Sequence, residues 1–207
     1  MSPLQTLLEQ SSLHDVCGTA EKRARLKATL APTPTVRQVD GDLRLSEGQA
    51  LRFEEGRVHV KGHLILDEQS RLLVAGDLVV EGNIVNEGFD YALLFVGGAL
   101  TADNLLFHGE LVSLEGITVK GVAWTYYNDH STYADRLTAR VVVADDRAEA
   151  VDAVRADPHL AGHSSRIAEA LGKVLHAQAW DAEQGRPLPY PDLAKRLCQG
   201  KPLLREG

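Results

Sequence analysis

Eight histidines are the first residues in this 207-residue chain that could carry chemistry. His59 and His63 lie four residues apart in a segment of strand-like alternation, and this spacing would place both side chains on one face of a strand. A second group, Asp157, His159 and His163, contains ligand types that zinc accepts. A proline and a glycine interrupt that group, which predicts a polar connection between helices, and no carboxylate stands at matched spacing beside the first pair. We therefore predict exposed histidines and no metal site.

No catalytic signature accompanies the histidines. The sequence lacks GxSxG, HExxH, a Walker sequence and CxxC, which mark hydrolases, metalloproteases, nucleotide-binding proteins and thiol redox proteins. The two cysteines, Cys17 and Cys198, lie far apart and are predicted to be reduced thiols. We expect no catalytic residue, no cofactor and no enzyme activity.

The turn at residues 126–131 is the best candidate for a recognition surface. It contributes Tyr126, Tyr127, Asp129 and His130 as candidate partner-binding residues. Tyrosine is favoured at interfaces because it combines apolar area with a hydroxyl group. In an alternative interpretation, Trp124 and one tyrosine seal the last repeat against the C-terminal helices. Consecutive strand residues face opposite sides, so one tyrosine could serve each role.

Four acidic residues, Asp67, Glu68, Glu87 and Asp90, complete the set of candidate partner-binding residues. The chain has a net charge of −7, and residues 39–146 hold eighteen acidic and eight basic residues, a difference of −10. This excess disfavours binding to a nucleic-acid backbone and favours a basic protein partner. Asp67 and Glu87 are twenty residues apart, so coils of that length would place them at one corner as a negative stripe. Alternatively, charged corners simply keep the edge of a solenoid soluble.

The residues between 51 and 129 repeat about every twenty positions, and this repeat must position the candidates. Glycines recur at 56, 76, 97 and 116, and each is bounded by short stretches of alternating apolar residues. A fixed period of this size is typical of a solenoid, and the alternation predicts short strands. We predict a mainly β protein built on a single-stranded parallel β-helix of about five coils, with the right-handed form favoured.

Helical segments are expected on both sides of the repeat. We divide the chain into an N-terminal helical cap at residues 1–36, a solenoid at 37–146 and a C-terminal helical cap at 147–207. The first cap is expected to lie across the open first coil and shield its edge. The second is expected to contain helices at 147–156, from Ser164 to about Gln184, and at 192–198, packed on the end or side of the solenoid.

The Gly-Asp-Leu and Gly-Asn-Ile coils, such as those at residues 76–78 and 82–84, resemble the bacterial polymer-forming cytoskeletal proteins, the bactofilins. Bactofilins are β-helices that assemble end to end. The run at residues 126–129 and the closing strand at 137–146 resemble another set of bacterial β-solenoid proteins, associated with polymorphic-toxin loci that encode immunity proteins. These resemblances cover about residues 39–146. Bactofilins carry short disordered tails, whereas about sixty residues of helix-like sequence follow the last predicted strand of this chain.

These observations favour a non-enzymatic, protein-binding β-solenoid of the cytoplasm. The leading hypothesis is an immunity-type protein that neutralises a basic toxin by occluding its active site. The alternatives are a bactofilin-like structural protein that assembles with itself and a hexapeptide-repeat acyltransferase. A strict six-residue step is typical of the acyltransferases, and in this chain that step fails after each pair of glycines. We expect no nucleic-acid partner and no membrane association, and homodimerisation is left open.

Overall fold

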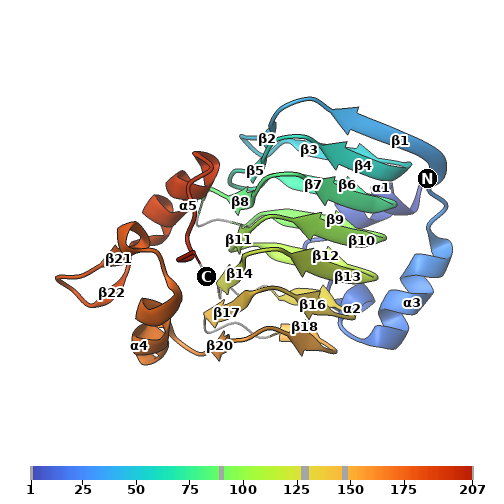
Figure 1. The fold of residues 1–207 in the computed structure, drawn as a ribbon. Coiled ribbons are helices and arrows are strands. Elements are labelled where there is room, and N and C mark those ends of the chain that lie inside the picture. Colours follow the sequence, from blue (N-terminus) through green and yellow to red (C-terminus); the bar gives the residue numbers. More distant parts are fainter. Residues whose placement is uncertain (1, 89–90, 127–130, 146–148, 207) are drawn as a thin grey trace.

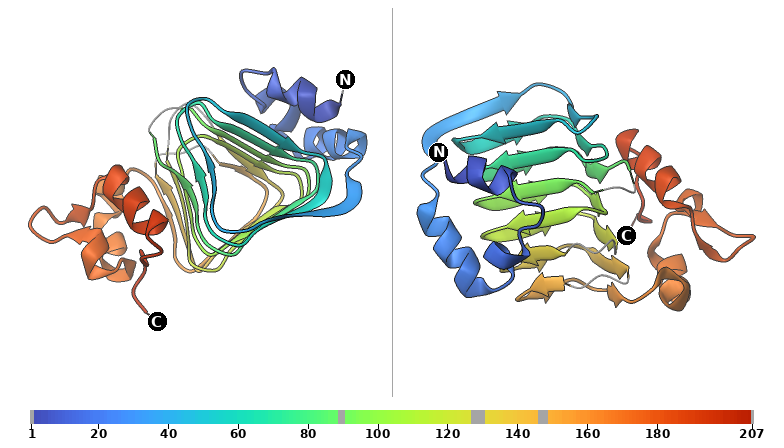
Figure 2. Two further views of the ribbon diagram at one scale, coloured as in Figure 1. Left: turned by 90° about the horizontal axis from the view of Figure 1, so that it is seen from above. Right: turned by 180° about the vertical axis from the view of Figure 1, so that it is seen from behind.

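The computed structural model describes residues 2–88, 91–126, 131–145 and 149–206. Most of these residues wind into a parallel β-solenoid of about six turns with a triangular cross-section (Figures 1 and 2). Short strands on its three faces stack into three parallel sheets. The prediction of a mainly β, parallel solenoid with helices near both termini is therefore confirmed.

We name the three sheets A, B and C. In stacking order, sheet A contains β1 (Thr33–Val39), β4 (Glu55–Val60), β7 (Asp77–Val80), β10 (Ala99–Ala102), β13 (Gly116–Val119), β16 (Leu137–Thr138) and β19 (Val154–Arg155). Sheet B contains β2 (Leu43–Leu45), β5 (Leu64–Leu66), β8 (Ile84–Asn86), β11 (Leu105–Phe107), β14 (Val122–Tyr126), β17 (Val141–Asp145) and β20 (His159–Ala161). Sheet C contains β3 (Ala50–Phe53), β6 (Arg71–Val74), β9 (Leu93–Val96), β12 (Glu110–Ser113), β15 (Thr132–Ala134) and β18 (Glu149–Val151).

The twenty-residue period sets the register between the strands of successive coils in these sheets. Val58 pairs with Leu78, which pairs with Leu100, and all three side chains point into the solenoid, where they are buried. Because alternate residues of a strand face opposite sides, each strand turns one set of residues, largely apolar, to the interior and the other set to the outside. Stacking lets every coil bury its interior set on its neighbours.

The N-terminal helices lie on the outer surface of sheet C. They are α1 (Pro3–Leu8), α2 (His14–Cys17) and α3 (Ala20–Thr29), and Figure 2 shows them beside the solenoid. Leu4, Leu7 and Leu13 pack on outward residues of sheet C such as Leu93 and Phe95. The prediction that this segment lies across the first coil is wrong. The outer surface of sheet C is itself apolar, so the helices bury more there than they would over the rim of one coil.

The C-terminal helices cover the outer surface of sheet B. They are α4 (Ser164–Val174) and α5 (Tyr190–Cys198), joined by a 3-10 turn at Ala177–Ala179 and a hairpin of β21 (Trp180–Asp181) and β22 (Arg186–Pro187). The helix expected from Ser164 to about Gln184 thus ends ten residues early. Leu171, Leu193 and Leu197 pack against Val85, Leu106 and Trp124 of the sheet. Of the two predicted positions, end or side, the structure shows the side.

The prediction of a helix at residues 147–156 is also wrong. The described part of that segment forms β18 and β19, and β20 follows, so the strands continue past residue 146 to Ala161. Val151 and Val154 pack on the interior cluster of the solenoid, and pairing with β15 and β16 supplies their backbone hydrogen bonds. At the other end, β1 begins at Thr33, so the first strand lies partly within the segment predicted as the N-terminal cap.

Candidate partner-binding surface

The predicted acidic corner exists, between sheets B and C. Leu45 pairs with Leu66, and Leu66 pairs with Asn86, so the turns that follow these residues stack on one another. Asp67 therefore lies above Glu87, as the twenty-residue period predicted. The same register places Glu47 above Glu68. The alternation shared by residues 39–45 and 60–66 would have predicted this position, but Glu47 was not among the predicted candidates. The view from above in Figure 2 shows this corner between the two terminal segments, covered by neither.

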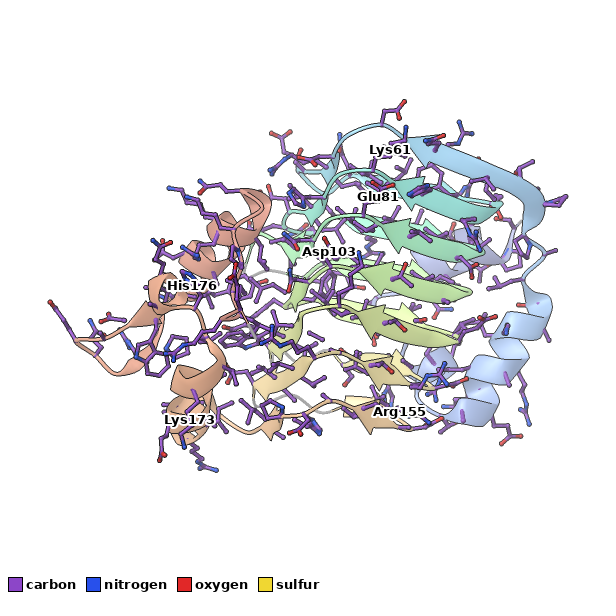
Figure 3. All side chains as sticks on the ribbon, viewed as in Figure 1. Lys61, Glu81, Asp103, Arg155, Lys173 and His176 are labelled. Atoms are coloured by element: carbon purple, nitrogen blue, oxygen red, sulfur yellow. The ribbon has the colours of Figure 1, made fainter. Side chains whose placement is uncertain are left out.

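Ion pairs neutralise most acids elsewhere on the repeat. Sheet A is the face on which no helix of the described chain lies, and Figure 3 shows Lys61, Glu81 and Asp103 following one another along it. Four acids on this face have cationic or histidine partners: Asp40 with Lys61 at 2.8 Å, Asp77 with Arg57 at 3.1 Å, Glu81 with His59 at 2.8 Å, and Asp103 with Lys120 at 2.6 Å. The excess acidity read from the sequence is therefore not spread evenly over the surface.

Two corner carboxylates stand apart from this pattern. Among the described acids of residues 39–146, Glu47 and Glu68 are the two whose carboxylates form no ion pair or hydrogen bond, and both residues are exposed. Asp67 accepts a hydrogen bond from the backbone N–H of Glu68 at 2.8 Å. Glu87 is paired with Arg44, which comes from the coil two before it in the chain, so one cation interrupts the predicted stripe. The free negative charge of the corner therefore lies at Glu47, Asp67 and Glu68.

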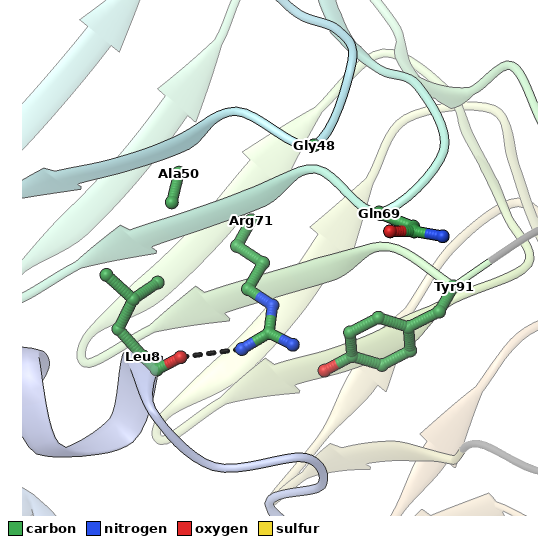
Figure 4. Close-up of a pocket in the computed structure, with 6 residues that line it drawn as sticks. All are labelled: Leu8, Gly48, Ala50, Gln69, Arg71 and Tyr91. Carbon is green, nitrogen blue, oxygen red and sulfur yellow. Dashed lines mark hydrogen bonds between the residues drawn. The ribbon is translucent and has the colours of Figure 1, made fainter.

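A hollow of about 480 Å³ lies beside this corner, under the end of α1 (Figure 4). Gly48 and Gln69, from the turns that carry the acids, form one wall, and Arg71 and Tyr91 form another. The Arg71 guanidinium lies 5.4 Å from the centre of the Tyr91 ring and donates to the carbonyl oxygen of Leu8 at 2.6 Å. Burial, and next the nearby Glu110 carboxylate, raise the pKa of Tyr91, so its hydroxyl stays protonated.

Tyr126 is the described member of the predicted tyrosine turn. Its ring stacks on Trp124 at 5.6 Å between centroids and meets the Tyr190 ring edge-on at 4.8 Å. Burial, followed by the charge of Asp145, raises the pKa of Tyr126. The alternative interpretation, in which Trp124 and one tyrosine seal the strands against the C-terminal helices, is therefore confirmed for this pair. Tyr127, Asp129 and His130 lie outside the described residues, as does Asp90.

The predicted histidines do not form a common site. His59 pairs with Glu81 on sheet A, whereas Nδ1 of His63 accepts from the backbone N–H of Asn83 at 2.9 Å at the corner between sheets A and B. His163 accepts from the backbone N–H of Ser165 at 3.2 Å and so caps α4. Over the described ranges, no three His, Cys, Asp or Glu side chains gather as a metal site would require.

One buried and one partly buried cysteine complete the chemistry of the described chain. Cys17 and Cys198 are free thiols, in agreement with the prediction of reduced cysteines. Burial raises the pKa of each thiol to about 12, with further contributions from Glu110 for Cys17 and from Glu87 for Cys198. Thiols with such values remain protonated at neutral pH and are poor nucleophiles.

No protein-family model, curated protein or solved structure matches this chain. Every helix in the described part of the chain is too short or too polar to cross a membrane.

Proposed function

We propose that this protein is a non-enzymatic, protein-binding β-solenoid whose corner between sheets B and C docks a basic protein. The observation that carries the proposal is the pairing pattern of its acids. Glu47 and Glu68 remain unpaired on adjacent coils, whereas the other described acids of the repeat region have partners. Two unpaired carboxylates and Asp67 on stacked turns form a fixed array of negative charge, which attracts and orients a cationic surface.

The rigid setting of the corner supports the same proposal. Each acid stands on a turn whose backbone is fixed by the coil next to it, for example through the hydrogen bond from Asp67 N–H to the Leu45 carbonyl at 2.9 Å. Little conformational entropy is therefore lost when a partner binds. The adjoining hollow adds donors from Arg71 and Gln69, so the partner should place an acceptor oxygen there beside its cationic residues.

Neutralisation of a toxin is the form of this function that the sequence resemblance favours. A basic toxin domain held at the corner would have the solenoid, about six turns tall, standing against it as a rigid wall. Such a wall would block access to the active site of the toxin without any chemistry on the solenoid side. The mechanism in this proposal is steric and electrostatic occlusion.

Removal of charge from the corner tests the proposal. In native-cell co-purification, the wild-type chain is expected to retain a stable basic protein, encoded by a neighbouring gene if the role is immunity. The double variant Glu47→Gln and Glu68→Gln should lose that protein or bind it on the order of tenfold more weakly, mainly through slower association. The binding should also weaken as salt concentration rises.

A matched control separates a local effect from a general change in charge. Glu183→Gln with Glu206→Gln removes the same charge from exposed residues of the C-terminal segment, and it should leave the partner bound. Equal binding by both double variants, or the absence of any stable protein partner, would contradict the proposed docking corner.

Self-assembly is a second candidate, and one specific observation favours it. The described helices lie beside the solenoid, so none of them caps either end of the coil stack (Figures 1 and 2). The first strand exposes 64% of Val36, and apolar interior residues at the two ends, such as Phe53 and Val154, are only partly buried. Edge strands with free backbone groups are templates for further pairing.

Light scattering over a range of protein concentrations tests self-assembly. End-to-end association should raise the mean mass steadily with concentration, and Val36→Lys on the edge strand should suppress that rise. A chain that remains a monomer or a dimer at high concentration would rule out the filament.

A further inference from the structure

A second hollow, of about 400 Å³, lies between the C-terminal segment and sheet B, and it shares no lining residue with the hollow beside the acidic corner. Tyr126 of β14 and Tyr190 of α5 supply aromatic surface to it. The hairpin and the start of α4 supply the other residues on which its chemistry depends, namely His163, Ser165, Arg186, Leu188 and Pro189. A volume of this size is within the usual range for small-molecule sites.

The aromatic wall is rigid. Tyr126 is fixed between Trp124 and Tyr190, and the Tyr190 hydroxyl donates to the Asn86 carbonyl oxygen at 2.5 Å. That hydroxyl is therefore already occupied within the protein, so Tyr190 contributes its ring rather than its polar end to the lining of the hollow. Together with Leu188 and Pro189, these rings give the hollow a wall that favours a flat or branched apolar group.

The polar groups of the hollow are donors. Arg186 is exposed on β22 and forms no ion pair with any described residue. Nδ1 of His163 accepts from the Ser165 backbone N–H, so the neutral ring carries its proton on Nε2. No carboxylate is present among the described residues that line the hollow, and the nearest acid on the adjacent strand, Asp145, is buried. The charge of the described lining is therefore positive.

We propose that this hollow binds a small organic acid, a carboxylate carried on an aromatic or branched aliphatic group. The Arg186 guanidinium would hold the carboxylate through two parallel N–H donors, and the apolar group would lie against Tyr126, Leu188 and Pro189. α4, the hairpin and β14 each supply residues to the lining, and the volume of the hollow suits one such group.

Ligand-observed NMR and calorimetry on the full chain test this site with 3-phenylpropionate and its uncharged amide. The acid should bind with a dissociation constant on the order of millimolar, as expected for about eleven heavy atoms. The amide should bind at least about tenfold more weakly, because the charge-assisted pair with Arg186 is lost. Equal binding of acid and amide, or no saturable binding of the acid, would overturn the proposal.

Three variants locate the site. Arg186→Gln should weaken binding of the acid about tenfold and leave the weak binding of the amide unchanged. Ser165→Trp should abolish binding of both, because the new side chain fills the hollow. Arg140→Gln, at an exposed arginine of the corner between sheets A and B, should change neither.

Tighter binding of a blocked peptide that ends in phenylalanine than of 3-phenylpropionate would overturn the assignment to a small acid. An unchanged affinity in Arg186→Gln would overturn it as well.

Discussion

Buried charged groups attach the N-terminal helices to the solenoid. Glu110 is fully buried on sheet C, and its carboxylate accepts from the backbone N–H of Leu13 at 3.0 Å and from the Ser12 hydroxyl at 3.1 Å. Arg23 is 1% exposed and reaches Asp135 at 3.0 Å and Asp152 at 2.8 Å, on successive coils. A charge held in this way contributes to stability chiefly because its removal leaves desolvated partners unmatched.

Replacement of Arg23 by methionine should therefore destabilise the protein. The variant keeps an apolar stem but loses the hydrogen bonds to Asp135, Asp152 and the Cys17 carbonyl. We expect the free energy of unfolding to fall by about 2 kcal/mol, which is less than for a fully buried ion pair, because both aspartates remain half exposed. Chemical denaturation followed by circular dichroism measures the change.

Arg25→Met on the same helix is the matched control. Its guanidinium pairs with Glu21 at the surface, where exposed pairs contribute about 0.5 kcal/mol or less. Similar losses of unfolding free energy in the two variants would show that any arginine-to-methionine change in this helix is destabilising. The buried contacts of Arg23 would then not be the cause.

For single residues, the sequence predicted which side chains share a corner better than it predicted which side chains pair with one another. Asp67, Glu68 and Glu87 share a corner as the period required, because register follows from coil length. The Arg44–Glu87 pair joins residues 43 positions apart across an intervening coil, and no local pattern encodes such a contact. Tyr126 illustrates a second limit, since the sequence allowed both exposure and burial until the packing of Tyr190 was known.

Among the strands, the close stacking of successive coils contributes most to the stability of the fold. Gly76 lies directly over Gly56, and a Cβ atom at Gly76 would stand 2.1 Å from the Gly56 carbonyl oxygen. The glycines of the repeat were predicted to permit close stacking, and this contact shows the reason at one corner. The neighbour is backbone held in a sheet on both sides, so it has little freedom to move away.

Gly76→Ala should consequently be strongly destabilising. We expect a loss of about 3 kcal/mol or more in the free energy of unfolding, because the added methyl group forces two coils apart. Thermal and chemical denaturation would measure it. Gly172→Ala, within α4, is the comparison. Its added Cβ atom would lie 3.2 Å from the Trp180 ring, a side chain that can shift, so it should change stability by about 1 kcal/mol or less. A mild effect of Gly76→Ala would mean that the coils separate more easily than the register implies.

Residues 147–156 were predicted as a helix, whereas the described part of this segment forms strands β18 and β19. Its sequence, RAEAVDAVRA, is rich in alanine, glutamate and arginine, which favour a helix when only local preference counts. The last coil offers unpaired strand edges and an apolar interior, and Val151 and Val154 occupy the positions that continue that interior. Tertiary pairing therefore outweighs local propensity. The same segment also alternates, which is a signal for strands, but a helical interpretation fitted its composition equally well.

The whole molecule is a stack of coils held by two lateral segments. A simple solenoid has contacts only between neighbouring repeats, so its end coils can open locally. In this protein the N-terminal segment touches the first coils through Ser2 and Glu54 at 2.9 Å and the last coils through Arg23 and Asp152. The C-terminal segment spans sheet B in the same way, from Asn83, whose side-chain amide donates to the Leu197 carbonyl, to the contact of α4 with β20. Both segments therefore connect coils that do not touch each other.

Hydrogen exchange should reveal this connection. In the wild-type chain we expect protection of the last strands, β16 to β20, to approach that of the central strands, because Arg23 ties the last coils to the N-terminal helices. In Arg23→Met, amides of β16, β18 and β19 should exchange on the order of tenfold faster, while those of β7 and β10 change little. Mass spectrometry of peptides from each coil resolves the two regions, and Arg25→Met should match the wild type. Equal acceleration in all coils would contradict local opening, since it would mean that the stack and its lateral segments unfold as one cooperative unit.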